Sequence, residues 1–434
     1  MTERKYSAGF GNEHMSEAIA GALPIGQFSP QNVPLGLYTE KFSATAFTAP
    51  RAENRRTWFY RIRPSVLHGE FNLVRQTHLL TAPLKDVITP PNQLRWDPID
   101  IPDQPADFID GLVTVVANGD SALQVGMAAH LYLANKSMGK RYFYCADGEL
   151  LIVPQTGALT IRTECGVLDV VPGEIALIPR GMKFAVDLVD GAARGYVCEN
   201  YGHQFRLPER GPVGSDGYAN DRDFLAPVAA FEDLDGDYEL LCKFQGHLYQ
   251  ADIDHSPLDV VAWVGTSVPY KYDLALFNAM NSVTFDHPDP SIFGVLTSPS
   301  DTEGVANSDF VIFPPRWAVS ENTFRPPWYH RNTMSEFMGN VRGVYEGKKK
   351  GFRPGGMSLH NQMMPHGPDV GTYQAGSVSA PEEPARIKET LSFMFESRFA
   401  FQVSDWAMTH SARQEEYRHC WDALPRTFVR STGS

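Results

Sequence analysis

Short stretches of strand-forming residues, each ended by glycine or proline, limit what this chain can fold into more than any other feature of its sequence. They stand out between residues 142 and 188, and the segments with strand-like composition there are 149–153, 158–163, 168–171, 174–178 and 183–188. The turns between them contain Gly157, Gly166, Pro172, Gly173 and Gly181. Closely spaced strands joined by tight turns are typical of antiparallel sandwiches and barrels, not of alternating βαβ units. We therefore expect a mainly β protein.

The same segment predicts a jelly-roll β-sandwich in the first part of the chain. The spacing from Gly166 to Pro172 and Gly173 is similar to the second sequence motif of the cupins, a family of jelly-roll proteins. However, Leu177 stands where a metal-binding histidine would be expected, and residues 148–155 contain no histidine. The first barrel is therefore expected to be a metal-free scaffold.

A second β-rich segment begins near Asn281, so we divide the chain into an N-terminal domain, residues 1–280, with the jelly roll at its centre, and a smaller C-terminal β domain, residues 281–434. Helical patterns are sparse. The segments that come closest are 110–117, 129–137 and 412–423, the last of them stopped by Pro425. Residues 270–277 are expected to form a short helix or loop that connects the two domains.

Composition and charge exclude several classes of function. The net charge of −13 argues against nucleic acid and anionic membranes as partners, because such surfaces require clusters of Lys and Arg. The five cysteines are scattered and form no C-x-x-C pair, which fits a reducing cytoplasm and indicates neither a disulfide framework nor a zinc knuckle. No apolar run approaches the length of a membrane span, and the N-terminus does not look like an export signal.

The residues best suited to chemistry lie in the second half of the chain. His330 and Glu336 are followed by His360 and His366, and His287 lies upstream. Two neutral imidazoles and one carboxylate can cap one face of an octahedral ion and leave the opposite positions open, which is the arrangement of non-haem Fe(II) oxygenases. A lone histidine is usually structural, but a group of this kind predicts a metal site.

The spacing restricts how such a site can be built. Six residues of straight strand span about 20 Å, so the chain must turn between His330 and Glu336 for both to reach one ion. A loop is likewise required between His360 and His366, and Pro365 favours one. From spacing alone, His360 and His366 compete for one ligand position. The same donor set also suits a zinc or manganese isomerase or hydrolase, or a bicupin that binds a ligand without catalysis.

Longer motifs identify a resemblance along nearly the whole chain. They read SAGFGNEH at residues 7–14, TAFTAPR at 45–51, LRWDP at 94–98, FDHPDPSIF at 285–293 and FMFESR at 393–398, and both histidine segments lie between the last two. In this order they resemble the homogentisate 1,2-dioxygenase family. One departure is that Val264 and Thr266 stand where the family tends to carry His and Asn, which affects packing or assembly and leaves the chemistry untouched.

The resemblance implies a cytoplasmic Fe(II) enzyme of phenylalanine and tyrosine catabolism, which opens the ring of homogentisate with O2 to give 4-maleylacetoacetate. It implies that His330, Glu336 and His366 bind the iron. His287 matches the family's proton acceptor, and Tyr345 a position that contacts substrate, as does His366. His360 then becomes a neighbour of the ligands.

The resemblance also implies a hexamer built from two trimers. The lysine run at residues 348–350 has the right charge to attract an anionic substrate. A solvated turn is nevertheless the interpretation we favour for such a run, and we do not assign these lysines to the site.

Overall fold

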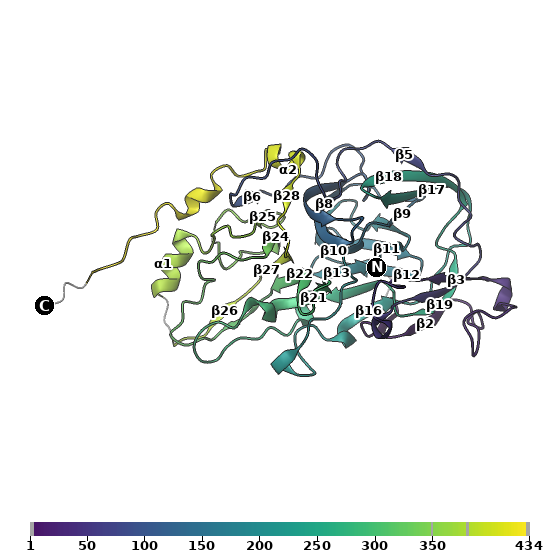
Figure 1. Cartoon of the computed structure of the whole chain (residues 1–434), viewed down its shortest axis with the longest axis horizontal. Coiled ribbons are helices and arrows are strands. Elements are labelled where there is room, and N and C mark those ends of the chain that lie inside the picture. Colours follow the sequence, from purple (N-terminus) through teal and green to yellow (C-terminus); the bar gives the residue numbers. More distant parts are fainter. Residues whose placement is uncertain (1–3, 349, 379–381, 431–434) are drawn as a thin grey trace.

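A jelly roll forms the centre of the N-terminal half (Figure 1). The computed structural model describes residues 4–348, 350–378 and 382–430. Strands follow the order β8-β15-β10-β13 in one sheet and β9-β14-β11-β12 in the other. This is the strand order of two Greek keys wound into a jelly roll, so the fold expected from the turns is confirmed. The bounds are β8 (Val125–Ala134), β9 (Arg141–Cys145), β10 (Glu149–Thr156), β11 (Leu159–Thr163), β12 (Gly166–Val170), β13 (Glu174–Ile178), β14 (Phe184–Leu188) and β15 (Ala193–Asn200).

The five strands expected from the sequence are confirmed as β10 to β14. Two of the expected helices are wrong, because residues 110–117 and 129–137 fall largely in β7 (Leu112–Asp120) and β8. Almost every residue of these two strands is buried. A strand covered on both faces has no alternation of apolar and polar residues, so the period of two that identifies a strand is missing from its sequence.

Further strands widen both sheets of the jelly roll. The first becomes nine-stranded, in the order β1-β16-β20-β13-β10-β15-β8-β7-β28, and the second seven-stranded, in the order β12-β11-β14-β9-β17-β18-β5. Strand β17 pairs in parallel with β9, whereas the other ladders are antiparallel. The added strands are β1 (Tyr6–Ala8), β5 (Asn72–Val74), β16 (Phe224–Pro227), β17 (Asp235–Phe244), β18 (His247–His255), β20 (Tyr270–Asp273) and β28 (Gln402–Val403).

A four-stranded sheet lies beside the jelly roll and contains the departure noted at Val264. Its order is β2-β19-β4-β3, with bounds β2 (His14–Glu17), β3 (Tyr38–Phe42), β4 (Thr57–Arg61) and β19 (Val260–Gly265). Val264 is buried and belongs to a small apolar cluster with Tyr60 and Val261. An apolar side chain therefore suits this position.

The C-terminal half is built on a six-stranded sheet with the order β21-β22-β27-β24-β25-β6. A two-stranded ladder, β23 with β26, lies apart from it. The bounds are β6 (Leu94–Trp96), β21 (Gly294–Pro299), β22 (Ala306–Phe313), β23 (Arg316–Ala318), β24 (Ser335–Arg342), β25 (Met357–His360), β26 (Ala385–Ile387) and β27 (Leu391–Ser397). The halves exchange strands, because β6 comes from the first hundred residues and β28 joins the nine-stranded sheet. The division near residue 280 stays a prediction.

Helices are short and peripheral. Among the described residues, α1 (Val370–Val378) lies at the far end of the C-terminal half, and α2 (Asp405–Thr409) follows β28 (Figure 1). The helix expected at residues 412–423 is only a 3-10 turn, η7 (Tyr417–Trp421). No helix in the described part of the chain has the length and apolar composition to cross a membrane. The 3-10 turns are η1 (Pro34–Gly36), η2 (Arg51–Glu53), η3 (Gly211–Val213), η4 (Asp221–Asp223), η5 (Leu274–Leu276), η6 (Pro290–Phe293) and η7 (Tyr417–Trp421). Residues 270–277 form β20 followed by η5, so the expected connection is a strand and a turn.

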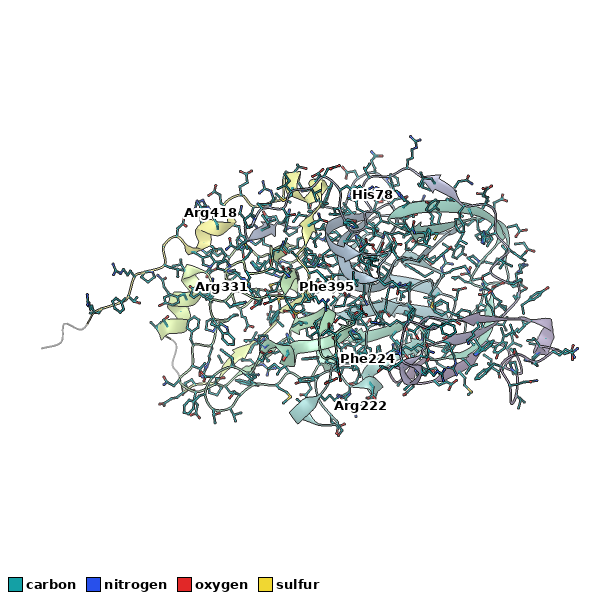
Figure 2. The ribbon with its side chains drawn as sticks, in the orientation of Figure 1. His78, Arg222, Phe224, Arg331, Phe395 and Arg418 are labelled. Atoms are coloured by element: carbon teal, nitrogen blue, oxygen red, sulfur yellow. The ribbon has the colours of Figure 1, made fainter. Side chains whose placement is uncertain are left out.

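One apolar core continues from the jelly roll into the six-stranded sheet. At the junction, Tyr196 of β15 donates a hydrogen bond to the Gly356 carbonyl over 2.8 Å, and its ring meets Phe393 of β27 edge-on at 5.0 Å. Phe395 of the same strand lies near the middle of the molecule, as Figure 2 shows. A Cβ added at Gly339 of β24 would lie 2.4 Å from the Phe393 ring. The strand that carries Glu336 is therefore fixed against the jelly roll.

Candidate metal centre

Three side chains from two segments converge beside β24. Glu336 is the second residue of that strand, and the chain bends just before it, at Thr333 and Met334. His330, before the bend, forms an isolated antiparallel bridge with His366, with backbone N–H to carbonyl distances of 2.9 Å in both directions. The bend required by the spacing is therefore present. One ligand atom from each of His330, Glu336 and His366 lies within 4.8 Å of the others.

Backbone carbonyls fix both imidazoles of this group. His330 Nδ1 lies 2.7 Å from the Trp328 carbonyl, and His366 Nδ1 lies 2.9 Å from the Met364 carbonyl. A carbonyl can only accept a hydrogen bond, so each Nδ1 carries a proton and each Nε2 is the atom available to a metal. Such support of the outer nitrogen sets the tautomer and orientation of metal-binding histidines.

Glu336 is the buried anion of the group. Its Oε2 is 2.9 Å from His366 Nε2, its Oε1 is 3.8 Å from His330 Nε2, and the Asn332 amide donates to Oε1. Burial alone would raise the pKa of Glu336, but the neighbouring imidazoles of His330 and His366 hold that pKa well below its usual range. In turn, Glu336 raises the pKa of His330 against the effect of burial. The carboxylate thus stays charged and available as a ligand.

His360 packs behind the group. It faces Glu336 across the β24–β25 ladder, its ring stacks on His366 at 4.0 Å, and its Nε2 is 2.9 Å from the Tyr417 hydroxyl. Its Nδ1 lies 3.9 Å from Glu336 Oε2 and is buried without a hydrogen-bond partner among the described residues. Burial and the neighbouring His366 keep the pKa of His360 well below its ordinary value.

The donor set fits a metal ion of the kind expected. It combines two preorganised imidazole nitrogens with one buried carboxylate, and the orphaned Nδ1 of His360 indicates polar space beside it. Of the two histidines that compete on spacing, His366 is the one that joins this set. His330, Glu336 and His366 are thus a candidate metal-binding triad.

The group opens into a cavity of about 360 Å³, which also brings His287 and Tyr345 to the same place. This volume lies within the range of pockets for small molecules. Its apolar walls include Phe293, Phe313 and Met338. All the site residues expected from the sequence therefore line one cavity.

His287 has one of its two ring nitrogens engaged. Its Nε2 lies 3.0 Å from the Phe324 carbonyl, and its ring is 5.6 Å from that of Trp328. Because the carbonyl accepts, the neutral ring carries its proton on Nε2 and keeps the lone pair on Nδ1. The geometry leaves Nδ1 able to take a proton.

Tyr345 is held by aromatic rings. It meets Phe313 edge-on at 5.5 Å and Phe352 at 6.0 Å. Burial raises the pKa of Tyr345 well above its ordinary value, so the phenol is neutral and can donate a hydrogen bond.

Two residues of the cavity were missed from the sequence. Lys348 is 6% exposed, so the solvated-turn interpretation is wrong for it, and burial lowers its pKa to about 8. Glu396 of β27 lies opposite Glu336 across the ladder, and burial followed by the charge of Glu336 raises its pKa to about 8. An isolated lysine run carries no signal of burial. The apolar β27 sequence, FMFES, gave a weak signal for Glu396, because its one acidic residue lies in a buried strand.

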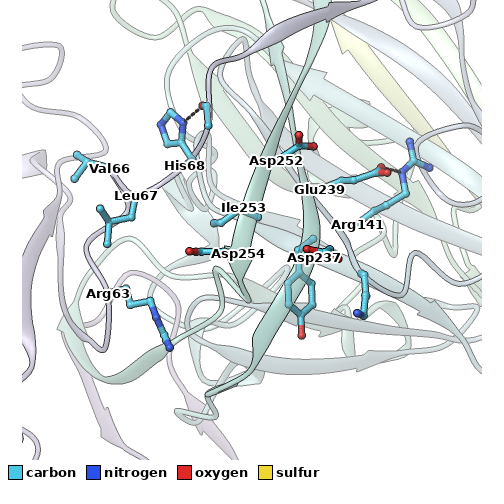
Figure 3. Close-up of a pocket in the computed structure, with 13 residues that line it drawn as sticks. Arg63, Val66, Leu67, His68, Arg141, Asp237, Glu239, Asp252, Ile253 and Asp254 are labelled. Atoms are coloured by element: carbon cyan, nitrogen blue, oxygen red, sulfur yellow. Dashed lines mark hydrogen bonds and ion pairs between the residues drawn. The ribbon is translucent and has the colours of Figure 1, made fainter.

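A larger groove, of about 1070 Å³, lies between strands β17 and β18 and residues 63–69 (Figure 3). Its charges are of both signs and several are paired, as in the 3.2 Å contact between Arg141 and Glu239. Within the described residues, the group of potential ligands that converges is the one at Glu336, away from this groove. We therefore place the functional site in the smaller cavity.

Comparison with known families covers both halves of the chain. Residues 5–274 match the model described as Homogentisate 1,2-dioxygenase N-terminal, and residues 275–428 match Homogentisate 1,2-dioxygenase C-terminal. Among solved structures, a mutant of Bacillus subtilis oxalate decarboxylase is 11% identical, with 74% of this chain and 82% of that chain covered and a TM-score of 0.30. A protein of unknown function from Pseudomonas syringae is 13% identical, with 74% and 100% covered and a TM-score of 0.29. Similarity this low says nothing about activity.

Proposed function

Because this chain belongs to the homogentisate 1,2-dioxygenase family, we propose that His330, Glu336 and His366 bind Fe(II) for the cleavage of the homogentisate ring by O2. The product we propose is 4-maleylacetoacetate. The observation that carries the metal assignment is the convergence of the three ligand atoms within 4.8 Å. Two histidines and one carboxylate with open positions are the ligands of non-haem Fe(II) oxygenases. When bound, the iron would supply coordination positions for substrate and O2 and would pass to O2 the electrons that the substrate gives up on ring cleavage.

The protein's own residues prepare the substrate. Ring cleavage requires that a phenolic hydroxyl loses its proton, and a positioned neutral histidine is suited to accept it. We assign this role to His287, because the Phe324 carbonyl holds its proton on Nε2 and leaves Nδ1 as acceptor.

Tyr345 is assigned to substrate binding. Its neutral phenol is able to donate a hydrogen bond to the substrate, and the rings of Phe313 and Phe352 restrict its position. His366, on the same cavity wall, contacts the substrate as well as the metal in our assignment. The apolar walls orient the aromatic ring and exclude water from it.

The direct test is turnover after anaerobic reconstitution with Fe(II). We expect one O2 consumed per homogentisate, a ring-opened product, and little reaction with gentisate, whose carboxylate lies one methylene closer to the ring. Zn(II) and Mn(II) loading in parallel identify the active metal. Full activity with zinc, or absence of O2 uptake in protein with iron demonstrably bound, would reject the proposal.

The role of His287 is tested by His287→Gln, which keeps a polar side chain of similar length. Loss of a general base typically lowers turnover by about 10²- to 10⁴-fold. His247→Gln serves as the matched control, because His247 is an exposed residue of β18 outside the cavity. If both variants keep wild-type turnover with equal iron content, His287 is not the base.

We further propose that the chain works in the cytoplasm as a hexamer of two trimers, and that residues 281–434 form its catalytic domain. Large exposed apolar side chains such as Ile25 and Phe47 support burial between copies. Light scattering on the eluted protein should give a mass six times the 48.3 kDa of one chain. A monomeric mass at working concentrations would contradict this assembly.

A further inference from the structure

Lys348 is a buried cation at the wall of the substrate cavity. Its side chain is 6% exposed, although it begins a run of lysines whose third member, Lys350, is exposed. Lys349 lies outside the described residues. A buried ammonium is costly unless its charge is compensated, so its position calls for a partner.

The surroundings of Lys348 supply little compensating charge. Its Nζ donates to the Gly367 carbonyl, and it lies over the Trp421 ring at 4.3 Å and the Tyr417 ring at 5.7 Å. Lys348 takes part in no ion pair among the described residues, and the charge of Asp369 offsets only part of the effect of burial on its pKa. An ammonium has three donors, and the Gly367 carbonyl takes one.

Other cations of the cavity are already engaged. Arg316 forms an ion pair with Glu346 and a further hydrogen bond to the Pro314 carbonyl. Arg325 donates to the backbone carbonyls of Ser320 and Glu383. Of these three cavity cations, Lys348 has the positive charge that its neighbours compensate least. We therefore expect an anion to bind beside Lys348.

The place of Lys348 suits one end of the substrate. Gly367, which accepts its hydrogen bond, directly follows the metal-triad residue His366. The substrate of this family has two phenolic hydroxyls, and one of them lies on the ring carbon next to the one that carries the acetate. A substrate with that hydroxyl directed to the metal triad therefore has its carboxylate near the triad as well, within the region that Lys348 borders.

We propose that Lys348 recognises the carboxylate of the substrate and so determines selectivity for an acidic over a neutral ring compound. This inference rests on the proposed function for the identity of the substrate. The competing explanation is mechanical: Lys348 holds the Gly367 carbonyl and thereby the loop of His366. The two differ in what they predict for an uncharged substrate.

The experiment compares homogentisate with its neutral amide, 2,5-dihydroxyphenylacetamide, on wild type and Lys348→Met. Hydrogen bonds to charged groups are worth about 1.5–3 kcal/mol, so kcat/KM for the acid should fall by about 10- to 200-fold. For the amide, kcat/KM should change by less than about threefold. Lys348→Arg should keep the preference for the acid, and Lys350→Met, with an exposed side chain, should behave as wild type.

Anaerobic calorimetry of acid and amide binding provides a readout that needs no turnover. Lys348→Met should weaken binding of the acid selectively while iron content stays at the wild-type level. An equal loss for acid and amide, or loss of iron, would overturn the inference in favour of the mechanical role, and unchanged acid binding would overturn it outright. If Lys348→Met does not fold, loss of the acid preference in Lys348→Arg would overturn it. Selective acid binding by wild type without O2 uptake would leave the inference standing and refute the proposed function instead.

Discussion

Binding of a divalent metal to the triad should release protons, and Glu336→Gln should change the pH at which it does so. In the protein without metal, Glu336 raises the pKa of His330, so this imidazole keeps its proton above pH 6.5. A metal ion must displace this proton, because only the deprotonated Nε2 is a ligand.

The magnitude follows from proton linkage. Each displaced proton makes metal affinity rise tenfold per pH unit, or about 1.36 kcal/mol, until the pH exceeds the raised pKa of His330. We therefore expect a release of up to about one proton near pH 6, with a decline toward zero at higher pH. In Glu336→Gln the carboxylate that raises the pKa of His330 is gone. In this variant, proton release on metal binding should decline at a lower pH than in wild type. The affinity for the metal should also fall, because a charged ligand is lost.

Anaerobic calorimetry with Fe(II), in buffers of different ionisation enthalpy, measures the proton release directly. Glu303→Gln is the control, because Glu303 is exposed and belongs to neither the triad nor its cavity. The reasoning fails if wild type releases no protons at pH 6, or if Glu336→Gln shows the wild-type release curve with unchanged affinity.

Three further substitutions test the stability of the fold. Gly339→Ala should lower the unfolding free energy in urea by about 1–3 kcal/mol, because its Cβ would lie 2.4 Å from the Phe393 ring; wild-type stability would mean that the contact relaxes freely. Lys243→Met should cost about 3–5 kcal/mol in the same assay, because it leaves the buried Glu199, now 2.6 Å from the ammonium, without its ion pair; a smaller loss than for an exposed lysine would contradict this. Burial raises the pKa of Glu149 to about 7, so the folded protein holds a proton that the unfolded chain loses above pH 4.5. This contribution to stability is present at low pH and is lost as the pH rises through 7. Glu149→Gln should remove the decline in unfolding free energy, and a variant with the same pH profile of stability as wild type would contradict this reasoning.

The jelly roll was readable from the sequence because its turns are local. A Pro-Gly pair or a lone glycine fixes a bend within a few residues, and the segments between such bends matched strands β10 to β14. The central strands β7 and β8 were misread because burial on both faces removed the alternation that identifies a strand. The two strands pair with each other, but their other neighbours, β28 and β15, lie far along the chain, and no local pattern records a neighbour of that kind.

For the site, the sequence indicated which types of residue could bind a metal, but not which of them come together in the folded chain. The spacing correctly required a bend before Glu336, but it left His360 and His366 equivalent. Only the bridge between His330 and His366 brings the second of these into the triad. Lys348 shows the same limit, because a side chain is buried by its tertiary neighbours and its sequence context is that of a surface turn.

Because β6 belongs to the sheet of the C-terminal half and β28 to a sheet of the N-terminal half, the two halves cannot be separated without breaking strand pairs. If the second half were separated at residue 281, β25, which carries His360, would lose its partner β6 and become an open edge. An unpaired edge strand is a template for association with other chains. The two halves are therefore interdependent in the folded state, and we expect recombination to pass on the six-stranded sheet only together with the residue 94–96 strand that covers its β25 edge.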